Sequence, residues 1–180
     1  KLFEKLRAQP EWQSEDPFVR ANAVRRLDET AQDPFAEIAQ HDEDSRVRRA
    51  AIGRITELSV IVERFTRNSE HDEDVRMVVT QRIRDLLICA EDADFASAGL
   101  ELFDDERDVA VVARSAANEE VAEEAVHRIG NDKLLGAVAR RSKHVAVARS
   151  ALGRLTDSQE LCSVAIKADD KLVAREAYDR

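Results

Sequence analysis

The residues with the clearest chemical potential are a histidine and three acids in a row, HDED, which occur twice. The first copy covers residues 41–44 and the second covers residues 71–74. Imidazole nitrogens and carboxylate oxygens are common ligands of divalent metal ions. The repeated motif is therefore a candidate metal centre.

The spacing of the two copies argues against a shared metal site. The copies lie 30 residues apart, whereas the apolar motifs that follow them, at Val47 and Val75, lie 28 residues apart. Neither copy has the alternating acids, the glycine and the distal glutamate of a calcium-binding loop. Acids are also favoured at helix starts, where they accept hydrogen bonds from unpaired N–H groups and meet the positive end of the helix dipole. We therefore interpret both copies as loops that lead into helices, and we expect no metal ion and no cofactor.

The remaining reactive side chains form no catalytic pattern. Cys89 and Cys162 lie in the apolar stretches LLICA and LCSVAI, a context typical of a thiol that acts as a small buried hydrophobe. His127 has no nucleophile at a recognisable spacing. The sequence contains no GxSxG, phosphate-binding loop or HExxH motif. We therefore expect a protein that is not an enzyme.

The composition predicts an all-α protein. Among 180 residues, aromatics make up 4%, charged residues make up 36%, and glycine and proline together number eight. So few turn formers, with many Ala, Arg, Glu and Leu residues, favour helices over a sheet. No run approaches the roughly 18 apolar residues of a membrane span, and no secretory signal opens the chain, so we expect a cytoplasmic protein without a membrane partner. Because the chain starts at Lys1 and stops inside the repeat described next, we expect a longer parent protein.

A nine-residue motif recurs along the chain, as in VRRAAIGRI and VARSALGRL. The recognisable copies begin at Val19, Val47, Val75, Val121, Val147 and Val173. Their starts are separated by 28, 28, 46, 26 and 26 residues. A degenerate copy, FASAGLELF from Phe95, divides the long gap into 20 and 26 residues, although it lacks the valine and both arginines and its register is open. The chain thus contains about seven units.

The first, fifth and ninth positions of the motif predict one buried helix face. In the second copy these are Val47, Ala51 and Ile55, whose spacing places them on one stripe of an α-helix. A second helix follows each motif, as in ELSVIVERF at 57–65, where apolar residues recur at helical spacing. Each unit is therefore predicted to be a hairpin of about 26–28 residues, too small to bury its own apolar face. Stacked hairpins of this kind form an α-solenoid.

Local signals predict where several helices begin. Asp16-Pro17 and Asp33-Pro34 each provide an N-cap acceptor followed by proline at the first helical position. Asp157, with a glutamate three residues later, resembles a capping box. Before the first motif we expect a short helix over residues 2–9, and we expect Trp12 to cover the end of the solenoid.

The recurring pattern D-x-x-V-R-x-x-A-(V/I)-x-R-(L/I), as in DSRVRRAAIGRI, resembles short HEAT-like repeats over residues 16–180. The stretches PEWQSEDPFVRANAVRRL and HDEDSRVRRAAIGRITEL are similar to the N-terminal part of certain bacterial proteins of unknown function, in which such repeats precede coiled-coil-like helices. The resemblance implies a right-handed α-solenoid of about seven short hairpins over residues 16–180, as one domain. A capping helix and loop over residues 1–15 would precede it. Later units depart from the pattern, with alanine at the second position.

The eighth position of the motif is its most regular polar position. Successive units have Arg26, Arg54, Arg82, Leu102, Arg128, Arg154 and Arg180 there. One interpretation is a row of cations that contacts nucleic-acid phosphates. The other, which we favour, is that each arginine stem covers the edge of the core while the guanidinium pairs with an acid at the next helix start, such as Asp28 or Asp157.

Charge is unevenly distributed in the second half of the chain. Residues 91–124 contain twelve acids and two arginines, a net charge of −10, whereas residues 125–154 contain seven Lys or Arg and one acid, a net charge of +6. The basic stretch ARRSKHVAVAR at 139–149 lacks the aromatics and the wide basic surface that nucleic-acid binding favours. We interpret this stretch as a solvated loop beside the acidic residues 91–124, and we keep it as the best local candidate for a protein-docking patch. Its candidate residues are Arg128, Arg140, Arg141, Lys143, Arg149 and Arg154.

The sequence thus predicts a non-catalytic scaffold that holds a protein partner through the shape and charge of a helical surface. Nucleic-acid binding through the eighth-position arginines is the alternative, and it predicts an affinity that falls steeply with salt. A third interpretation comes from the resemblance alone, since some enzymes that attach chromophores use short HEAT-like repeats. No residues of this sequence mark such an active site.

Overall fold

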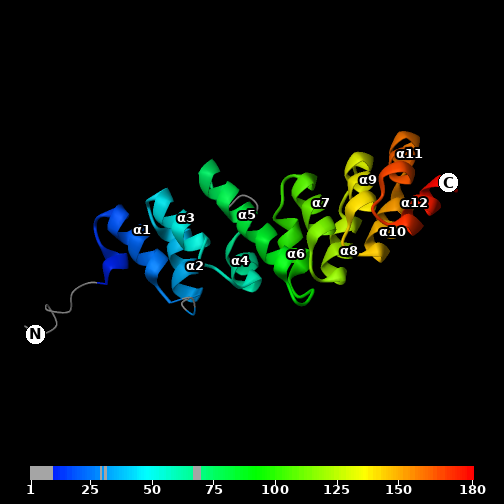
Figure 1. Cartoon of the computed structure of the whole chain (residues 1–180). Coiled ribbons are helices and arrows are strands. Elements are labelled where there is room, and N and C mark those ends of the chain that lie inside the picture. The colour runs from blue at the N-terminus through cyan, green and yellow to red at the C-terminus, as the bar shows by residue number, and fades with distance from the viewer. Residues whose placement is uncertain (1–9, 29, 31, 67–69) are drawn as a thin grey trace, which may run out of the picture. The chain divides into compact units, whose positions relative to one another are not determined.

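The computed structural model describes residues 10–28, 30, 32–66 and 70–180. Every regular element within these residues is a helix, so the predicted all-α class is confirmed (Figure 1). The short helix predicted over residues 2–9 lies outside the described residues. In the part of the chain that the structure describes, no helix is both long enough and apolar enough to cross a membrane.

The described residues form one short 3₁₀ helix and twelve α-helices. In chain order these are η2 (Glu11–Gln13), α1 (Pro17–Arg26), α2 (Gln32–His41), α3 (Ser45–Ile52), α4 (Leu58–Arg64), α5 (Glu73–Cys89), α6 (Ala96–Glu101), α7 (Glu106–Ser115), α8 (Glu119–His127), α9 (Asp132–Arg141), α10 (Val145–Arg154), α11 (Ser158–Lys167) and α12 (Lys171–Tyr178). The copies of the nine-residue motif lie on α1, α3, α5, α8, α10 and α12, and the degenerate copy lies on α6. We call these the motif helices.

The described residues divide by their packing into two compact units, the first ending at Arg82 and the second beginning at Ile83. In the first unit, the motif helices α1 and α3 pack side by side, and α2 packs on both α3 and α4. The 3₁₀ helix η2 packs on α1, and Trp12 within it is half-buried. The first unit is thus built from successive hairpins in contact.

The second unit repeats one arrangement three times. Helix α7 packs on α8, α9 on α10, and α11 on α12. Each packed hairpin therefore joins a helix to the motif helix that follows it, whereas the sequence prediction paired each motif helix with the helix after it. Between hairpins, α9 contacts both α7 and α11, while the motif helices α6, α8, α10 and α12 contact one another in succession (Figure 1). The second unit therefore has two layers of helices, one of them formed by motif helices.

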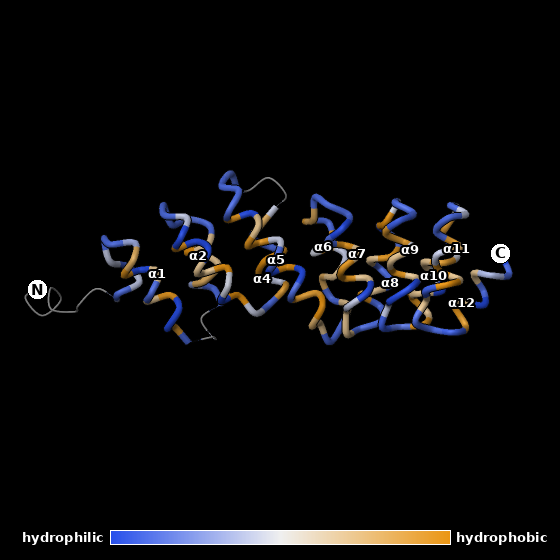
Figure 2. Tube along the Cα trace, turned by 45° about the horizontal axis from the view of Figure 1, so that its top comes forward, coloured by the Kyte–Doolittle hydropathy of each residue, from blue (hydrophilic) through white to orange (hydrophobic). Residues whose placement is uncertain are grey.

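The core follows the predicted positions of the motif. Val47, Ala51 and Ile55 are fully buried, as are the equivalent Val147 and Leu155 in the second unit. In each unit, apolar stretches lie within the helices, whereas the loops and most helix ends are hydrophilic (Figure 2). Small residues at the fifth position let neighbouring helices approach closely. Burial of the hydrophobic stripe is the main favourable contribution to the packing of one hairpin on the next.

The 20-residue spacing between Val75 and Phe95 has a structural cause. Helix α5 runs without interruption for 17 residues, so the loop that elsewhere separates a motif helix from the helix after it is absent. In the degenerate motif, the fifth and ninth positions, Gly99 and Phe103, are buried as the predicted register requires. The first position differs, because Phe95 is exposed and adopts a left-handed backbone with φ 61° just before α6.

The predicted helix starts are partly confirmed. Asp16 caps α1 by accepting a hydrogen bond from the Phe18 N–H at 2.8 Å, and Pro17 is the first helical residue. Asp33 is not a cap, because α2 begins one residue earlier at Gln32. Gln32 is buried, and its side-chain oxygen accepts a hydrogen bond from the Thr56 N–H at 2.9 Å.

The start of α11 matches only half of the predicted capping box. Asp157 is the N-cap and accepts hydrogen bonds from the N–H groups of Gln159 and Glu160. In a complete capping box the Glu160 carboxylate would accept a hydrogen bond from the Asp157 N–H. Here the Asp157 N–H donates instead to the carboxylate of Asp132, at 2.6 Å. A link between two helices has taken the place of a bond within one.

Both cysteines are exposed, which contradicts the burial expected from their apolar neighbours. In a helix, two residues correspond to a rotation of roughly 200°, so side chains two apart face opposite sides. Cys89 lies two residues after the buried Leu87, and Cys162 lies two residues before the buried Val164. The buried face therefore excludes both thiols.

Candidate functional site

The acids of the first HDED copy lie at a helix start, as predicted. Asp44 is the N-cap of α3, and its carboxylate accepts a hydrogen bond from the Arg46 N–H at 2.9 Å. The Arg46 guanidinium also pairs with this carboxylate and holds the pKa of Asp44 well below its usual range. Asp42 accepts a hydrogen bond from the Asp44 N–H and forms an ion pair with Arg20 of α1.

The second HDED copy is offset from the first in the structure. Glu70 accepts from the Asp72 N–H at 2.8 Å, just as Asp42 accepts from the Asp44 N–H at 2.9 Å. The equivalent acids are therefore 28 residues apart, in step with the helices, while the identical letters are 30 apart. Within the described residues, no group of three or more His, Cys, Asp or Glu side chains is placed to hold a metal ion.

An arginine at the second position of the motif forms a clamp that sequence reasoning missed. Arg20 is only 8% exposed, and its Nη1 donates to the carbonyl oxygens of Ser14 and Glu15 at 2.8 and 3.1 Å. Its Nε and Nη2 donate to the two carboxylate oxygens of Asp42, each at 2.9 Å. This pairing raises the pKa of Arg20 above its ordinary value. The buried cation is thus fully engaged by the protein itself.

Arg48 repeats the same clamp in the next motif. Its Nη1 donates to the carbonyl oxygens of Asp42 and Glu43, and its Nε and Nη2 donate to the carboxylate of Glu70 at 3.0 and 3.2 Å. In both clamps the carboxylate lies 22 residues after the arginine. The only sequence signal for the clamp was an acid 22 residues after the arginine. This spacing indicates a contact only when the packing of the hairpins is known.

Four of the eighth-position arginines bind backbone carbonyl groups. The donor and acceptor residues are Arg54 with Leu27, Arg82 with Ile55, Arg154 with Val126 and Ile129, and Arg180 with Leu152 and Leu155. Every acceptor lies in the last turn of the preceding motif helix or within three residues after it, where carbonyl groups lack partners within the helix. The predicted acceptors were acids at the next helix start, whereas the observed acceptors are helix ends one unit earlier. The arginines serve internal packing, as the favoured interpretation proposed.

The helices that alternate with the motif helices in the second unit are also joined to one another, through carboxylates at their N-terminal ends. The carboxylate of Asp132, at the start of α9, accepts from the N–H groups of Thr156 and Asp157 and from the Thr156 hydroxyl, at 2.6–3.0 Å. Glu106, at the start of α7, accepts in the same way from the N–H groups of Gly130 and Asn131. The hydrogen bonds to Asp132, above all that from the Thr156 hydroxyl, lower the pKa of its carboxyl group.

Three residues of the predicted docking patch lie where α9 ends. Arg140 donates to the carboxylate of Glu160 at 2.8 Å and to the Ser163 hydroxyl at 3.0 Å. The Lys143 ammonium donates to the Ser115 carbonyl at 2.7 Å. Arg141 is exposed, and its side chain has no hydrogen-bond or ion-pair partner among the described residues.

The other three residues of the predicted patch also have internal partners. Arg128 donates to the Ser97 hydroxyl at 2.6 Å and to the Glu124 carboxylate at 3.2 Å. Arg149 donates to the Glu176 carboxylate at 2.9 Å, and Arg154 donates to the end of α8. The positive charge of this segment is therefore largely used to join helices of the second unit.

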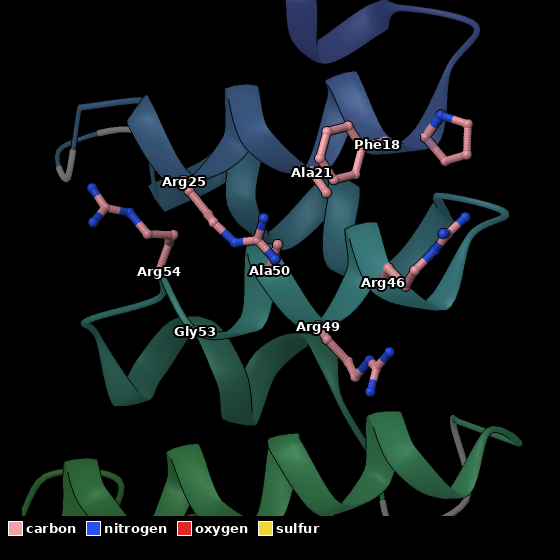
Figure 3. Close-up of a pocket in the computed structure, with 9 residues that line it drawn as sticks. Phe18, Ala21, Arg25, Arg46, Arg49, Ala50, Gly53 and Arg54 are labelled. Atoms are coloured by element: carbon pink, nitrogen blue, oxygen red, sulfur yellow. The ribbon is translucent and has the colours of Figure 1, made fainter.

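A groove on the first unit was missed by sequence reasoning. It has a volume of about 750 Å³ and lies between the motif helices α1 and α3 (Figure 3). Small and apolar residues line part of it, and four arginines line the rest. The lining residues are Pro17, Phe18, Ala21, Ala50 and Gly53, with Arg25, Arg46, Arg49 and Arg54. None of these nine residues is acidic.

The groove arises at positions of the motif that vary between units. Phe18 immediately precedes the first motif and is 66% exposed, and Ala21 is the third residue of that motif. The same two positions on α8 in the second unit are Glu120 and Glu123, so the groove chemistry belongs to the first unit. The repeat is defined by the motif positions that stay constant between units. A surface formed by the positions that vary is therefore not apparent from the repeat.

Comparison with known proteins supplies no relative, since neither the scan against protein-family models nor the search of curated proteins finds a match. The class of protein must therefore be argued from the structure. What the structure defines is an all-α protein of packed helical hairpins with a basic, partly apolar groove on its first unit.

Proposed function

We propose that this chain is a non-catalytic protein-interaction scaffold built as an α-solenoid of short HEAT-like hairpins. The architecture is supported by the range of its long links. Side-chain hydrogen bonds between hairpins join residues about one repeat apart, from 20 positions for Arg140 and Glu160 to 31 for Arg128 and Ser97. Such nearest-neighbour bonding is typical of repeat proteins. The right-handed superhelix stays a prediction.

The observation that carries the functional proposal is the exposed Phe18 in the groove between α1 and α3. Its ring is 66% exposed beside small side chains and arginines. Leaving an aromatic ring in water forgoes the free energy that burial would provide, about 1.5–3 kcal/mol for a large apolar side chain. Aromatic and arginine side chains are also the types most enriched where proteins bind one another. A protein partner that covers Phe18 would use both.

Nucleic-acid binding is the weaker alternative. It required the eighth-position arginines to face phosphates, but Arg54, Arg82, Arg154 and Arg180 donate to carbonyl groups of the protein, and Arg128 pairs with Glu124. Releasing them would leave helix ends without partners, which costs free energy for each group. The predicted docking patch retains Arg141 as an exposed cation without a side-chain partner among the described residues, and it remains a second candidate surface for a protein partner.

The test is affinity capture from a lysate of the source organism, with and without nuclease and at two salt concentrations. We expect defined proteins to be retained after nuclease treatment. Material that is lost with nuclease and with high salt would instead favour nucleic-acid binding. Capture of no macromolecule under any of the conditions would contradict the scaffold proposal.

A further inference from the structure

We propose that the groove between α1 and α3 binds a short acidic segment of a partner protein that carries a large apolar side chain. The apolar side chain would lie in the hollow beside Phe18, and the carboxylates would pair with Arg25 and Arg49. This inference rests on the proposed scaffold function and names the chemistry of the partner.

The hollow exists because the facing positions of the two helices have small side chains. Ala21 of α1 and Ala50 of α3 line it, and Gly53 lies at the end of α3. A methyl group added at Gly53 would be in ordinary van der Waals contact with the carbonyl oxygens of Arg49 and Ala50, each at 3.6 Å, so the hollow is only lightly filled there. Phe18 forms an apolar wall of the same space (Figure 3). An apolar side chain of the partner would exchange water for these surfaces.

The four arginines differ in how far they are already used. Arg46 holds the carboxylate of Asp44 at 2.7 Å, and Arg54 donates to Leu27 and lies over the Phe35 ring. Because these two guanidinium groups already bind the protein's own groups, they would contribute positive electrostatic potential to the groove and would not pair directly with a ligand.

Arg25 and Arg49 are the cations that a ligand can engage. Arg25 is exposed and donates to the neutral side chain of Asn22 at 3.0 Å. Arg49 has a loose, solvent-exposed ion pair with Asp74, with 3.7 Å between nitrogen and oxygen. One arginine comes from each helix, and in Figure 3 the Arg25 side chain extends toward Ala50 of α3. Two carboxylates that flank an apolar residue would match this arrangement.

A nucleic acid fits the groove less well than an acidic peptide does. The exposed acids Asp16, Asp28 and Asp74 lie close to the arginines, since Asp16 and Asp28 interact electrostatically with Arg46 and Arg54 and Asp74 pairs with Arg49. A polyanion that extends beyond the groove would meet these carboxylates. A compact ligand with few charges avoids them.

Most exposed surfaces of a second copy of the chain lack the required chemistry. The acidic surface of α8 contains no exposed large apolar side chain. Helix α12 has the exposed Leu172 and Tyr178, but residues 171–180 include three basic and two acidic side chains and so lack the required charge. Residues 91–95 do combine exposed acids with the exposed Phe95, so the oligomeric state must be measured to distinguish a second copy from a separate partner.

The experiment begins with selection of displayed random twelve-residue peptides on the wild-type protein. The strongest peptides are then labelled, and their affinities are measured by fluorescence anisotropy alongside a twelve-nucleotide single-stranded DNA. The groove variants are Arg25→Glu/Arg49→Glu and Phe18→Ser. The matched control is Arg107→Glu/Arg175→Glu, which changes the net charge equally at exposed arginines of the second unit that do not line the groove. Circular dichroism checks that each variant is folded.

We expect the selected peptides to contain at least two acids around a Leu, Ile, Phe or Trp residue. The double charge reversal in the groove should weaken binding by about tenfold or more, while the control pair changes it by less than about threefold. Phe18→Ser should weaken binding of the same peptide, and it should have less effect on an analogue whose apolar residue is replaced by serine. This dependence on both charge and apolar contact distinguishes the groove from general electrostatic attraction.

Several results would overturn the inference. These are selection of no peptides, selected peptides without acids, equal binding by the groove and control variants, or tighter binding of the DNA. Sedimentation that shows a dimer abolished by Phe18→Ser would assign the groove to a second copy instead. If the Arg25→Glu/Arg49→Glu variant still captures the nuclease-resistant proteins that the wild type captures, the groove assignment fails while the scaffold function stands.

Discussion

At the scale of single residues, arginine is the side chain that joins this protein together. A second-position arginine donates hydrogen bonds to two carbonyl groups and one carboxylate. An eighth-position arginine donates to carbonyl groups at the end of the preceding motif helix. The planar guanidinium suits both tasks, because it offers five donors in a fixed geometry and stays charged at all ordinary pH values. The high charge content of the sequence is therefore, to a large extent, a feature of its internal bonding.

Replacement of Arg20 by alanine should destabilise the first unit. The substitution removes a buried ion pair and leaves Asp42, whose side chain is 11% exposed, without its cation. We expect a loss of about 2–4 kcal/mol in the free energy of unfolding, measured by urea denaturation. The matched control is Arg46→Ala, which removes an arginine–aspartate pair whose arginine is 58% exposed. An equal effect of the two substitutions would show that burial of the clamp is unimportant.

Two helical glycines with different surroundings should respond differently to alanine. At the exposed Gly153 of α10 an added methyl group meets nothing within 4 Å, so Gly153→Ala should stabilise the protein by about 0.5–1 kcal/mol. At the buried Gly136 of α9 the methyl group would clash with the Glu160 carboxylate and would displace it from Arg140. Gly136→Ala should therefore give no gain or a loss in thermal denaturation. In a Glu160→Ala background, the same substitution should become stabilising.

At the scale of elements, neighbouring hairpins are joined by hydrogen bonds that involve backbone groups as well as by the packing of their apolar stripes. The start of α9 accepts hydrogen bonds from the loop before α11, and the start of α7 accepts them from the loop before α9. Motif helices are joined at their opposite ends, where arginines reach the carbonyl groups of the preceding helix. These bonds fix the longitudinal register of neighbouring helices, which a hydrophobic stripe alone leaves loosely defined.

The link at Asp132 should make stability depend on acid pH. The pKa of Asp132 is lowered in the folded protein, so the ionised carboxylate contributes stability that is present above its unfolded pKa and is lost as the pH falls through the folded value. We expect Asp132→Ala to lower the melting temperature at pH 7. The difference from the wild type should shrink progressively as the pH falls below about 3.9, the ordinary value for aspartate. A difference that is constant between pH 7 and pH 3 would contradict the role of the charge.

Two residues of the predicted docking patch should differ in their effect on stability. Arg154→Gln removes hydrogen bonds to the carbonyl groups of Val126 and Ile129 at the end of α8 and should destabilise the protein by about 1–3 kcal/mol. Arg141→Gln alters an exposed side chain and should leave the unfolding curve unchanged within error. Chemical denaturation of both variants checks this contrast. Equal stability would mean that the capping bonds of Arg154 contribute nothing.

The elements could be predicted from the sequence more fully than the links between them. Val47, Ala51 and Ile55 are buried as their spacing predicts, because apolar periodicity reports directly on the buried face of a helix. The continuous helix α5 was not anticipated, since the missing loop leaves only an irregular spacing in the sequence. The exposure of Cys89 was not anticipated either, because an apolar neighbourhood does not specify which way a side chain faces.

The groove could not be predicted for a related reason. Phe18 and Ala50 are 32 residues apart, and nothing in either local sequence indicates that they line one hollow. Their juxtaposition depends on the packing of α1 on α3, which the repeat predicts only as a general contact. Docking residues were instead sought where basic residues cluster in the sequence. There, the structure uses most of the charges internally.

At the scale of the whole molecule, bonding is local throughout the described residues. The described residues form two compact units, and the long side-chain hydrogen bonds join neighbouring repeats, at separations of up to 31 residues. A perturbation in one hairpin therefore acts directly only on its neighbours. In proteins with this organisation, stability is approximately a sum of repeat terms and interface terms.

This locality predicts how a mutation in the first unit spreads. In Arg20→Ala, amide hydrogen exchange should become faster in α1, α2 and α3, which contain or contact the clamp. Exchange in α9 to α12 should change little, because those helices bond only within the second unit among the described residues. Hydrogen exchange followed by mass spectrometry measures both regions in one experiment. A uniform acceleration along the chain would show that the protein unfolds as a single cooperative body.

The carbonyl acceptors of the eighth-position arginines also bear on how such a chain can grow by duplication. Main-chain oxygens are present at every helix end, whatever the side chains there, so Arg154 and Arg180 require no particular residue in the hairpin that precedes them. A duplicated hairpin could therefore join its new neighbour at once, without a compensating substitution. The surface positions on the duplicate, such as those where one unit has Phe18 and Ala21 and another has Glu120 and Glu123, would then be free to diverge toward different ligands.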